Sequence, residues 1–460
     1  TYNTAVGYNA GRQVTTGVEN TIVGGLAGDA ITTGIRNVLA GYIAGSALTD
    51  ADYNIAIGNG ALGSDTLGST STAVGNDALG TQNFATATDT YNTAVGYSAG
   101  KVITTGVQNV LIGGLAGDAL TDADDNTAVG VGALTTDTLG SKSTAIGRSA
   151  LQTQNFTTAT DSYNTAVGHS AGIAVTTGVR NTLIGGLSGD ALTDADDNVA
   201  VGDNALGSDT LGSRSTAIGQ GALYAQNFTT ATHSNNTAVG YNAGAAVTTG
   251  INNTLIGDRT GDALTDADYN IAIGQGALTS DTLGSKSVAI GNQSLAQQNF
   301  TTATDSYNTA VGYSAGTSVT TGVENTLIGG LAGDAITTGD YNVAVGQSAL
   351  SAATTSDYNT AVGHNSGAAV TTGTQNTLIG ALAGDAFSDA DYNVAVGSQA
   401  LSQDTLGSMS IAIGQGALYS QNFTTATNSY NVAVGQSAGV AVTTGIKNTL
   451  IGGLAGDALT

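Results

Sequence analysis

The chain has 460 residues, among them 68 Gly, and 34 acidic residues face ten Lys and Arg, while Cys, Pro and Trp are absent. A formal charge of −24 repels phosphate backbones, and ten scattered bases do not make the basic patch that nucleic-acid binding needs. Without Cys there is no disulfide framework and no thiolate metal site, and no apolar run is long enough for a membrane span. We therefore expect no nucleic-acid partner and no membrane insertion.

One short phrase, first found as residues 3–7 (NTAVG), recurs through the whole chain. Aligned on its closing Gly it occurs 26 times, and 20 of the 25 steps between copies are 17 residues long while five are 21. Larger blocks of 72 residues start near residues 92, 164 and 236. A fixed period of this kind is typical of solenoids, so we expect residues 1–460 to form one continuous repeat region. The chain starts and stops within a copy, and we expect it to be an uncapped segment of a longer protein.

We number positions within a copy from the Asn of the phrase. Position 2 is always Thr, Val or Ile, and position 4 is Val or Ile in 25 copies, which is typical of a β-strand. A second short segment, such as residues 174–178 (AVTTG), is expected to form another strand. Position 5 is Gly in every copy and predicts a corner that excludes a Cβ. The first of these structural corner residues are Gly7, Gly24, Gly41, Gly58, Gly75 and Gly96.

These patterns predict an all-β fold, a parallel β-solenoid with coils of about 17 residues. Stacked coils place like residues on like, so the Asn of position 1 should form a ladder of amides that hydrogen-bond from coil to coil. At about 4.8 Å per step, the copies predict a rod of roughly 120 Å.

Position 3 is always apolar, and it is Ala in 18 copies, although it points away from positions 2 and 4. We expect positions 2 and 4 to fill the coil and position 3 to lie against another copy of the chain, in a parallel homo-oligomer. The alternative is a monomer in which small Ala side chains are simply exposed.

The five 21-residue copies carry an insertion that contains five of the six Phe. Long corners on a repeat scaffold often carry function, and an aromatic ring beside Gln, Asn and Thr could contact a sugar. We favour the alternative that each ring folds back and plugs the wider end of its coil. By the same logic, the Tyr residues that precede position 1 should cover corners. The possible ligand-contact residues are Phe84, Phe156, Phe228, Phe300 and Phe423.

Residues 120–126 and 192–198 (both LTDADDN) gather carboxylates whose oxygens could ligate Ca²⁺, although a solvated acidic corner is the simpler interpretation. The clusters are Asp122, Asp124 and Asp125, and Asp194, Asp196 and Asp197.

Catalytic groups have little support in the sequence. The three His residues stand at differing repeat positions, and no nucleophile accompanies them consistently. We expect no enzyme activity and no cofactor. The His residues are His169, His233 and His364.

The phrase resembles known repeats. Residues 287–294 (SVAIGNQS) and 143–150 (STAIGRSA) resemble the YadA-like head repeat of trimeric autotransporter adhesins, and the NTAVGYxA runs are similar to repeats of bacteriophage fibre proteins, including those of cyanophages. The resemblance implies a left-handed β-roll, a homotrimer, and a host glycan or protein receptor. It also implies a place on a virion, on a cell surface or outside the cell. Because the adhesin repeat is shorter, the corners here should be wider.

We therefore predict a structural protein, the stiff shaft of a viral fibre of a phage tail or head that positions a host-attachment tip. A bacterial adhesin head and a self-stacking extracellular filament are the alternatives. Ice binding by Thr rows at position 2 ranks below them, because Val or Ile replaces Thr in more than a third of the copies.

Overall fold

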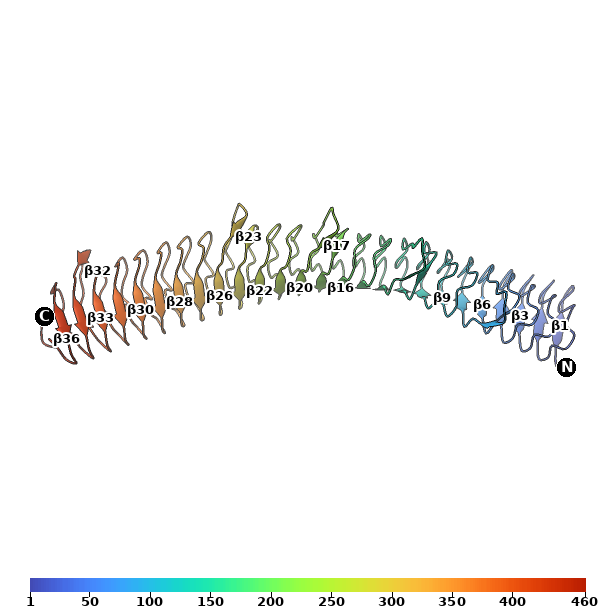
Figure 1. The fold of residues 1–460 in the computed structure, drawn as a ribbon, viewed down its shortest axis with the longest axis horizontal. Helices are drawn as coiled ribbons and strands as arrows, with labels where there is room; N and C mark the ends of the chain where they lie inside the picture. Colours follow the sequence, from blue (N-terminus) through green and yellow to red (C-terminus); the bar gives the residue numbers. More distant parts are fainter. The chain divides into compact units, whose positions relative to one another are not determined.

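The computed structural model describes residues 1–460 and contains strands and turns but no helix. Nothing helical in the chain has the length and apolar character of a membrane span. The residues form two compact units, 1–234 and 235–460. Within each unit, coils of 17 or 21 residues stack in sequence order, and every coil contributes one three-residue strand from positions 2–4 (Figure 1). The predicted all-β, parallel β-solenoid is confirmed.

The strands of the first unit pair in parallel, each with the strand of the next coil. Their register is constant, so Thr4 pairs with Thr21 and Ala5 with Ile22. Like positions therefore meet along the stack. The strands are β1 (Thr4–Val6), β2 (Thr21–Val23), β3 (Val38–Ala40), β4 (Ile55–Ile57), β6 (Thr72–Val74), β8 (Thr93–Val95), β9 (Val110–Ile112), β10 (Thr127–Val129), β12 (Thr144–Ile146), β14 (Thr165–Val167), β15 (Thr182–Ile184), β16 (Val199–Val201) and β18 (Thr216–Ile218).

The second unit repeats this arrangement with the same register, as in the pairing of Ala310 with Leu327. Its strands are β20 (Thr237–Val239), β21 (Thr254–Ile256), β22 (Ile271–Ile273), β24 (Val288–Ile290), β26 (Thr309–Val311), β27 (Thr326–Ile328), β28 (Val343–Val345), β29 (Thr360–Val362), β30 (Thr377–Ile379), β31 (Val394–Val396), β33 (Ile411–Ile413), β35 (Val432–Val434) and β36 (Thr449–Ile451).

Our prediction of a second strand in every coil is wrong. Residues 174–178 form a turn and a bend, although a hydrogen bond from Thr176 N to Thr193 O (2.9 Å) still joins neighbouring coils. The backbone is left-handed at positions 7 and 9 and again just before position 1, on either side of this segment.

Two-residue strand pairs occur only where a 21-residue coil follows a 17-residue one. Figure 1 shows β17 and β23 on the side of the coils away from the main strands. The pairs are β5 (Gly68–Ser69) with β7 (Thr88–Asp89), β11 (Gly140–Ser141) with β13 (Thr160–Asp161), β17 (Gly212–Ser213) with β19 (Thr232–His233), β23 (Gly284–Ser285) with β25 (Thr304–Asp305), and β32 (Gly407–Ser408) with β34 (Thr427–Asn428).

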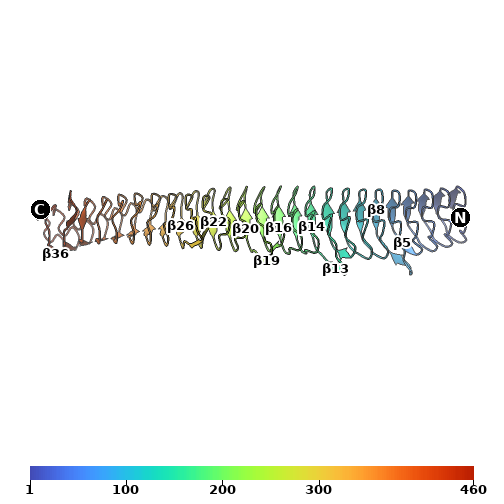
Figure 2. The ribbon, with the colours of Figure 1, turned by 90° about the horizontal axis from the view of Figure 1, so that it is seen from above.

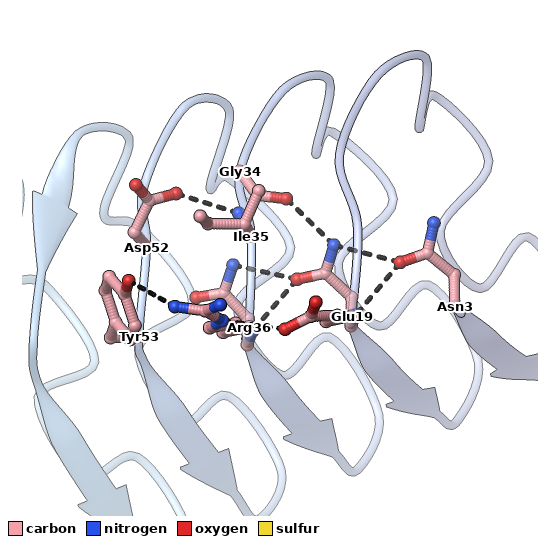
Figure 3. Close-up of polar contacts among 9 residues, drawn as sticks. Asn3, Glu19, Gly34, Ile35, Arg36, Asp52 and Tyr53 are labelled. Atoms are coloured by element: carbon pink, nitrogen blue, oxygen red, sulfur yellow. Dashed lines mark hydrogen bonds and ion pairs between the residues drawn. The ribbon is translucent and has the colours of Figure 1, made fainter. Parts of the chain in front are cut away.

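The Asn ladder is present as predicted (Figure 3). The backbone N–H of Asn20 donates to Asn3 Oδ1 (2.9 Å), and Asn20 Nδ2 donates to the carbonyl of Gly34 (2.8 Å) on the opposite wall of the coil. Asn37 repeats both bonds, to Asn20 Oδ1 (2.9 Å) and to the carbonyl of Ala51 (2.7 Å). Each buried amide thus ties together two walls of one coil and the start of the next.

The position-3 side chains lie inside their own coils, so our expectation that they contact another copy is wrong. In the coil that starts at Asn20, the interior contains Ile22, Ala27 and Ile31, from positions 3, 8 and 12, and all three are fully buried. Positions 1 and 3 share one face of a strand. Because the Asn amide of position 1 bonds inside the coil, position 3 must point inward and positions 2 and 4 outward.

Positions 9 and 12 share the remaining interior volume. Where position 9 is Gly, in fifteen copies, position 12 is Val, Ile, Leu or Phe; where position 9 is Leu, in eleven copies, position 12 is Asp, Gln or Ala. A Cβ at Gly28 would lie 2.7 Å from Leu39 Cδ1 and 3.0 Å from Ile31 Cδ1. Since the interior is close-packed, a large apolar side chain comes from one of the two positions and never from both.

The corner glycines of position 5 have φ between +127° and +146°. A Cβ on Gly24 would also overlap the carbonyl oxygen of Gly41 in the next coil. Both conditions require glycine. The corner residues named from the sequence all have such φ values, namely Gly7, Gly24, Gly41, Gly58, Gly75 and Gly96.

Candidate functional site

The outer face of the stacked strands is the most distinctive surface of each unit. We define it as the side chains at positions 2 and 4, which lie in rows because neighbouring strands lie side by side (Figure 2). Ile184 and Ile328, both at position 4, are 39% exposed, and Ile55 at position 2 is 37% exposed. No charged residue occupies either position in any of the 26 copies, although the whole chain carries a charge of −24. The Val and Ile row of position 4 is an exposed apolar stripe, and exposed apolar surface of this kind often marks an interaction site.

A second row borders the outer face. It consists of the residue immediately before position 1, which we call position 0. All 26 of these residues have φ between +49° and +66°, yet none is Gly. At the two other left-handed positions Gly does occur, in five copies at position 7 and in fifteen at position 9. A non-Gly residue in this conformation costs about 1 kcal/mol. Glycine would relieve the backbone at position 0, and yet every copy keeps a side chain there. The backbone conformation therefore does not explain why these side chains are present.

Position 0 contains ten of the 17 Tyr and six of the ten bases. Arg36 Nε contacts Glu19 Oε2 (2.7 Å), and its Nη1 donates to the Tyr53 hydroxyl (2.7 Å; Figure 3). These contacts raise the pKa of Arg36, and the hydrogen bond that Arg36 donates to the Glu19 carboxylate has the largest effect. Tyr341 and Tyr358 stack with ring centroids 4.8 Å apart. Tyr53, Tyr341 and Tyr358 thus contact their neighbours along the row, and Tyr53 remains 48% exposed.

Each insertion closes on a buried polar cluster that sequence reasoning missed. Gln82 Nε2 donates to Asp65 Oδ2 (2.6 Å) and to Ser71 Oγ (2.9 Å), and Gln82 Oε1 accepts from Asn92 Nδ2 (2.9 Å). Asp65 Oδ1 accepts the backbone N–H of Phe84 (3.3 Å). Ser replaces Asn at position 1 in these coils, and the Gln amide restores the broken ladder. The buried carboxylate is satisfied by N–H donors.

The cluster recurs wherever a 21-residue coil occurs, always with Asp and Gln at position 12 of successive coils. We call the pair the Asp–Gln clasp. Its strict co-occurrence in the sequence was the signal that could have revealed it. The other clasps are Asp137 with Gln154, Asp209 with Gln226, Asp281 with Gln298, and Asp404 with Gln421.

The five Phe rings of the insertions are each 5% exposed. In the first insertion, the Thr66 hydroxyl donates to the carbonyl of Phe84 (2.9 Å), which fixes the residue against the preceding coil. This burial supports the plug interpretation and leaves little ring surface for a sugar. The rings are Phe84, Phe156, Phe228, Phe300 and Phe423.

Five of the six carboxylates named as calcium ligands, all but Asp125, bond to the preceding coil. Asp124 Oδ1 accepts the N–H of Val107 (2.8 Å), and Asp122 Oδ1 accepts the hydroxyl of Thr105 (2.5 Å). Partial burial raises the pKa of Asp124. No three His, Asp or Glu side chains of the chain lie close enough to hold a metal ion. In the second cluster, Asp194, Asp196 and Asp197 bond to Thr177, Val179 and Arg180 respectively.

Comparison of the chain with models of known protein families finds no match, and a search of curated proteins finds no significant relative. The similarity to adhesin and fibre repeats therefore stays a prediction. Function has to be argued from the surfaces themselves, because a solenoid fold alone does not specify one.

Proposed function

We propose that the chain is a structural segment that assembles through its outer face into a parallel homotrimer and forms the shaft of a fibre. One observation carries the proposal. A row of Val and Ile at position 4 stays partly exposed, with Ile184, Ile328 and Ile379 at 39–40%, on a face without a single charge in a chain whose net charge is −24. Such a face lets copies approach closely, while the acidic flanks oppose other contacts.

The outer face supplies an energy of the size that association requires. Full burial of a Val or Ile side chain contributes about 1.5–3 kcal/mol, so covering the remaining exposed part of position 4 contributes roughly 1 kcal/mol per coil. Thirteen coils of one unit then supply on the order of 10 kcal/mol, which is comparable with the estimated association cost of about 4–15 kcal/mol. The Tyr and Arg residues of position 0 border this face, and both residue types are enriched in interfaces.

The constant spacing of the coils favours a parallel arrangement of the copies. Copies that run in the same direction can place every Val or Ile row against the equivalent row of a neighbour along the whole stack. The mechanical role then follows from the ladders of backbone and Asn hydrogen bonds, which resist local opening. We place the fibre on a virion surface, where it would position a host-attachment tip. A bacterial adhesin head or an extracellular filament is the alternative setting for the same assembly.

Light scattering tests the assembly directly. We expect a mass about three times that of the 44.9 kDa chain. The double variant Ile184→Asp with Ile328→Asp places charge on the outer face of each unit and should shift the mass towards the monomer. The matched control is Thr16→Asp with Thr338→Asp, at exposed positions away from the strands, and should leave the mass unchanged. A wild-type chain that stays monomeric at micromolar concentration refutes the trimer.

Ice binding is a second candidate, favoured by one observation. Position 2, which is Thr in most copies, lies on the exposed outer face beside the Val and Ile of position 4. A monomeric chain that produces thermal hysteresis in a freezing assay supports this function. A trimer without hysteresis rules it out in favour of the fibre.

A further inference from the structure

A polar hollow opens on the flank of the second unit, beside Gly276. Its volume is about 380 Å³, within the size range of small-molecule sites. It is formed by residues of positions 6, 7 and 10 from successive coils, which lie beyond the corner glycine of position 5. It is therefore separate from the outer face that we propose for assembly.

The hollow exists because position 7 lacks a side chain at Gly276. The neighbouring coils carry Arg259 and Gln293 at this position, and a Cβ on Gly276 would have only Gln293 Cγ nearby, at 3.9 Å. Its φ of +63° does not require glycine here, since Gln293 and Gln399 occupy position 7 at φ of +57° and +59°. Gly276 therefore leaves open space that the backbone would allow a side chain to fill.

Glycine at position 7 also leaves hollows in other coils. Gly60 and Gly416 also stand at position 7, and hollows of about 250 and 240 Å³ open beside them. The hollow at Gly276 is larger than these two. Its lining differs from theirs because it combines a carboxylate, a guanidinium, three amides and a Tyr ring.

Weakly engaged hydrogen-bonding groups line the hollow. Gln275 Nε2 donates to Asp258 Oδ2 at 3.4 Å, and Asn292 Nδ2 donates to Gln275 Oε1 at 3.3 Å. Bonds of this length are weak and are readily exchanged for a ligand's hydroxyls. Arg259 is exposed and forms none of the ion pairs of the chain, and Tyr313 is 61% exposed at the rim.

We propose that this hollow binds one unit of a neutral glycan. Amides, a carboxylate and a guanidinium offer both donors and acceptors at neighbouring points, which match the adjacent hydroxyls of a pyranose. The exposed Tyr313 ring offers an apolar surface for the C–H face of the sugar. Because Asp258 and Arg259 are adjacent and opposite in charge, the site favours an uncharged sugar over an acidic one. This inference rests on the proposed function in one respect, namely that a fibre on a surface encounters glycans. The hollow itself does not require the chain to form a trimer.

The test is binding of the intact chain to an immobilised panel of neutral oligosaccharides that contain galactose, glucose or N-acetylglucosamine, with their sialylated counterparts. We expect the wild type to bind neutral members, and Gly276→Gln, which fills the hollow with a side chain already used at this position, to weaken binding at least about tenfold. Arg259→Gln and Tyr313→Ala should also weaken it. The matched control Gly132→Gln changes the same repeat position in the first unit and should leave binding unchanged.

Three outcomes overturn the site: no binding by the wild type, equal binding by Gly276→Gln, or a preference for the sialylated glycans. Light scattering on the same samples separates this result from the assembly proposal. A trimer without glycan binding removes only the site. If the chain is monomeric, binds the glycan and no longer binds it in Gly276→Gln, the glycan site is supported and the trimer is refuted.

Discussion

Volume exchange between positions 9 and 12 gives the sharpest prediction. In the coil that starts at Asn325, position 9 is Gly333 and position 12 is the buried Ile336, whereas the next coil has Leu350 and Ala353 instead. Ile336→Ala alone removes buried methyl groups and should cost about 2–5 kcal/mol of unfolding free energy. Gly333→Leu alone overfills the interior, because its Cβ would lie 2.7 Å from Leu327 Cδ2 and 2.8 Å from Ile336 Cδ1. Overpacking should cost about 1–3 kcal/mol, and the left-handed backbone about 1 kcal/mol more.

The double variant Gly333→Leu with Ile336→Ala removes the overlap with Ile336 but keeps Leu327 at position 3, where the next coil has Ala344. We expect it to be more stable than the sum of the two single effects predicts, with a coupling of about 1 kcal/mol or more. Urea unfolding gives the global free energy, and amide hydrogen exchange in residues 325–341 gives the local one, because repeat proteins can open locally. Additive single effects, with a double variant less stable than either single one, would refute the exchange of volume.

Asn181→Ala should cost about 2–4 kcal/mol, because the carbonyl of Ala195 and the backbone N–H of Asn198 both lose a buried partner; unchanged amide exchange in these coils would argue against the ladder as a stabilising element. Gln154→Ala should cost about 1.5–3 kcal/mol by leaving the Asp137 carboxylate without its side-chain donor, and a urea midpoint equal to that of the wild type would contradict this. Burial raises the pKa of Asp118 above 3.8, so the folded chain holds this proton more tightly than the unfolded chain, and stability should rise as the pH falls through the raised pKa. Asp118→Asn should raise the melting temperature at pH 7 and flatten this pH dependence; a melting temperature that falls in the variant would reverse the assigned sign.

The sequence by itself determined the elements that depend on neighbouring residues. β-branched residues two apart, followed by an invariant Gly, specify a short strand and a corner, and both lie where the pattern placed them. The constant period specifies stacking, and stacking specifies the Asn ladder, since like positions must meet. These features can be predicted without knowing which contacts close the coil.

The inward and outward faces were decided only by the tertiary structure. Positions 2, 3 and 4 are all apolar or Thr, so alternation shows that position 3 opposes the other two but not which side is inside. The choice is made by Asn side chains, which bond to a carbonyl 14 residues further along the chain, as Asn20 does to Gly34. Residues such as Tyr53 and Leu62 take left-handed backbone conformations against their own preference, because hydrogen bonds to adjacent coils hold them there. Contacts between coils, and not the local preferences of single residues, therefore set the path of the chain and the surfaces that it exposes.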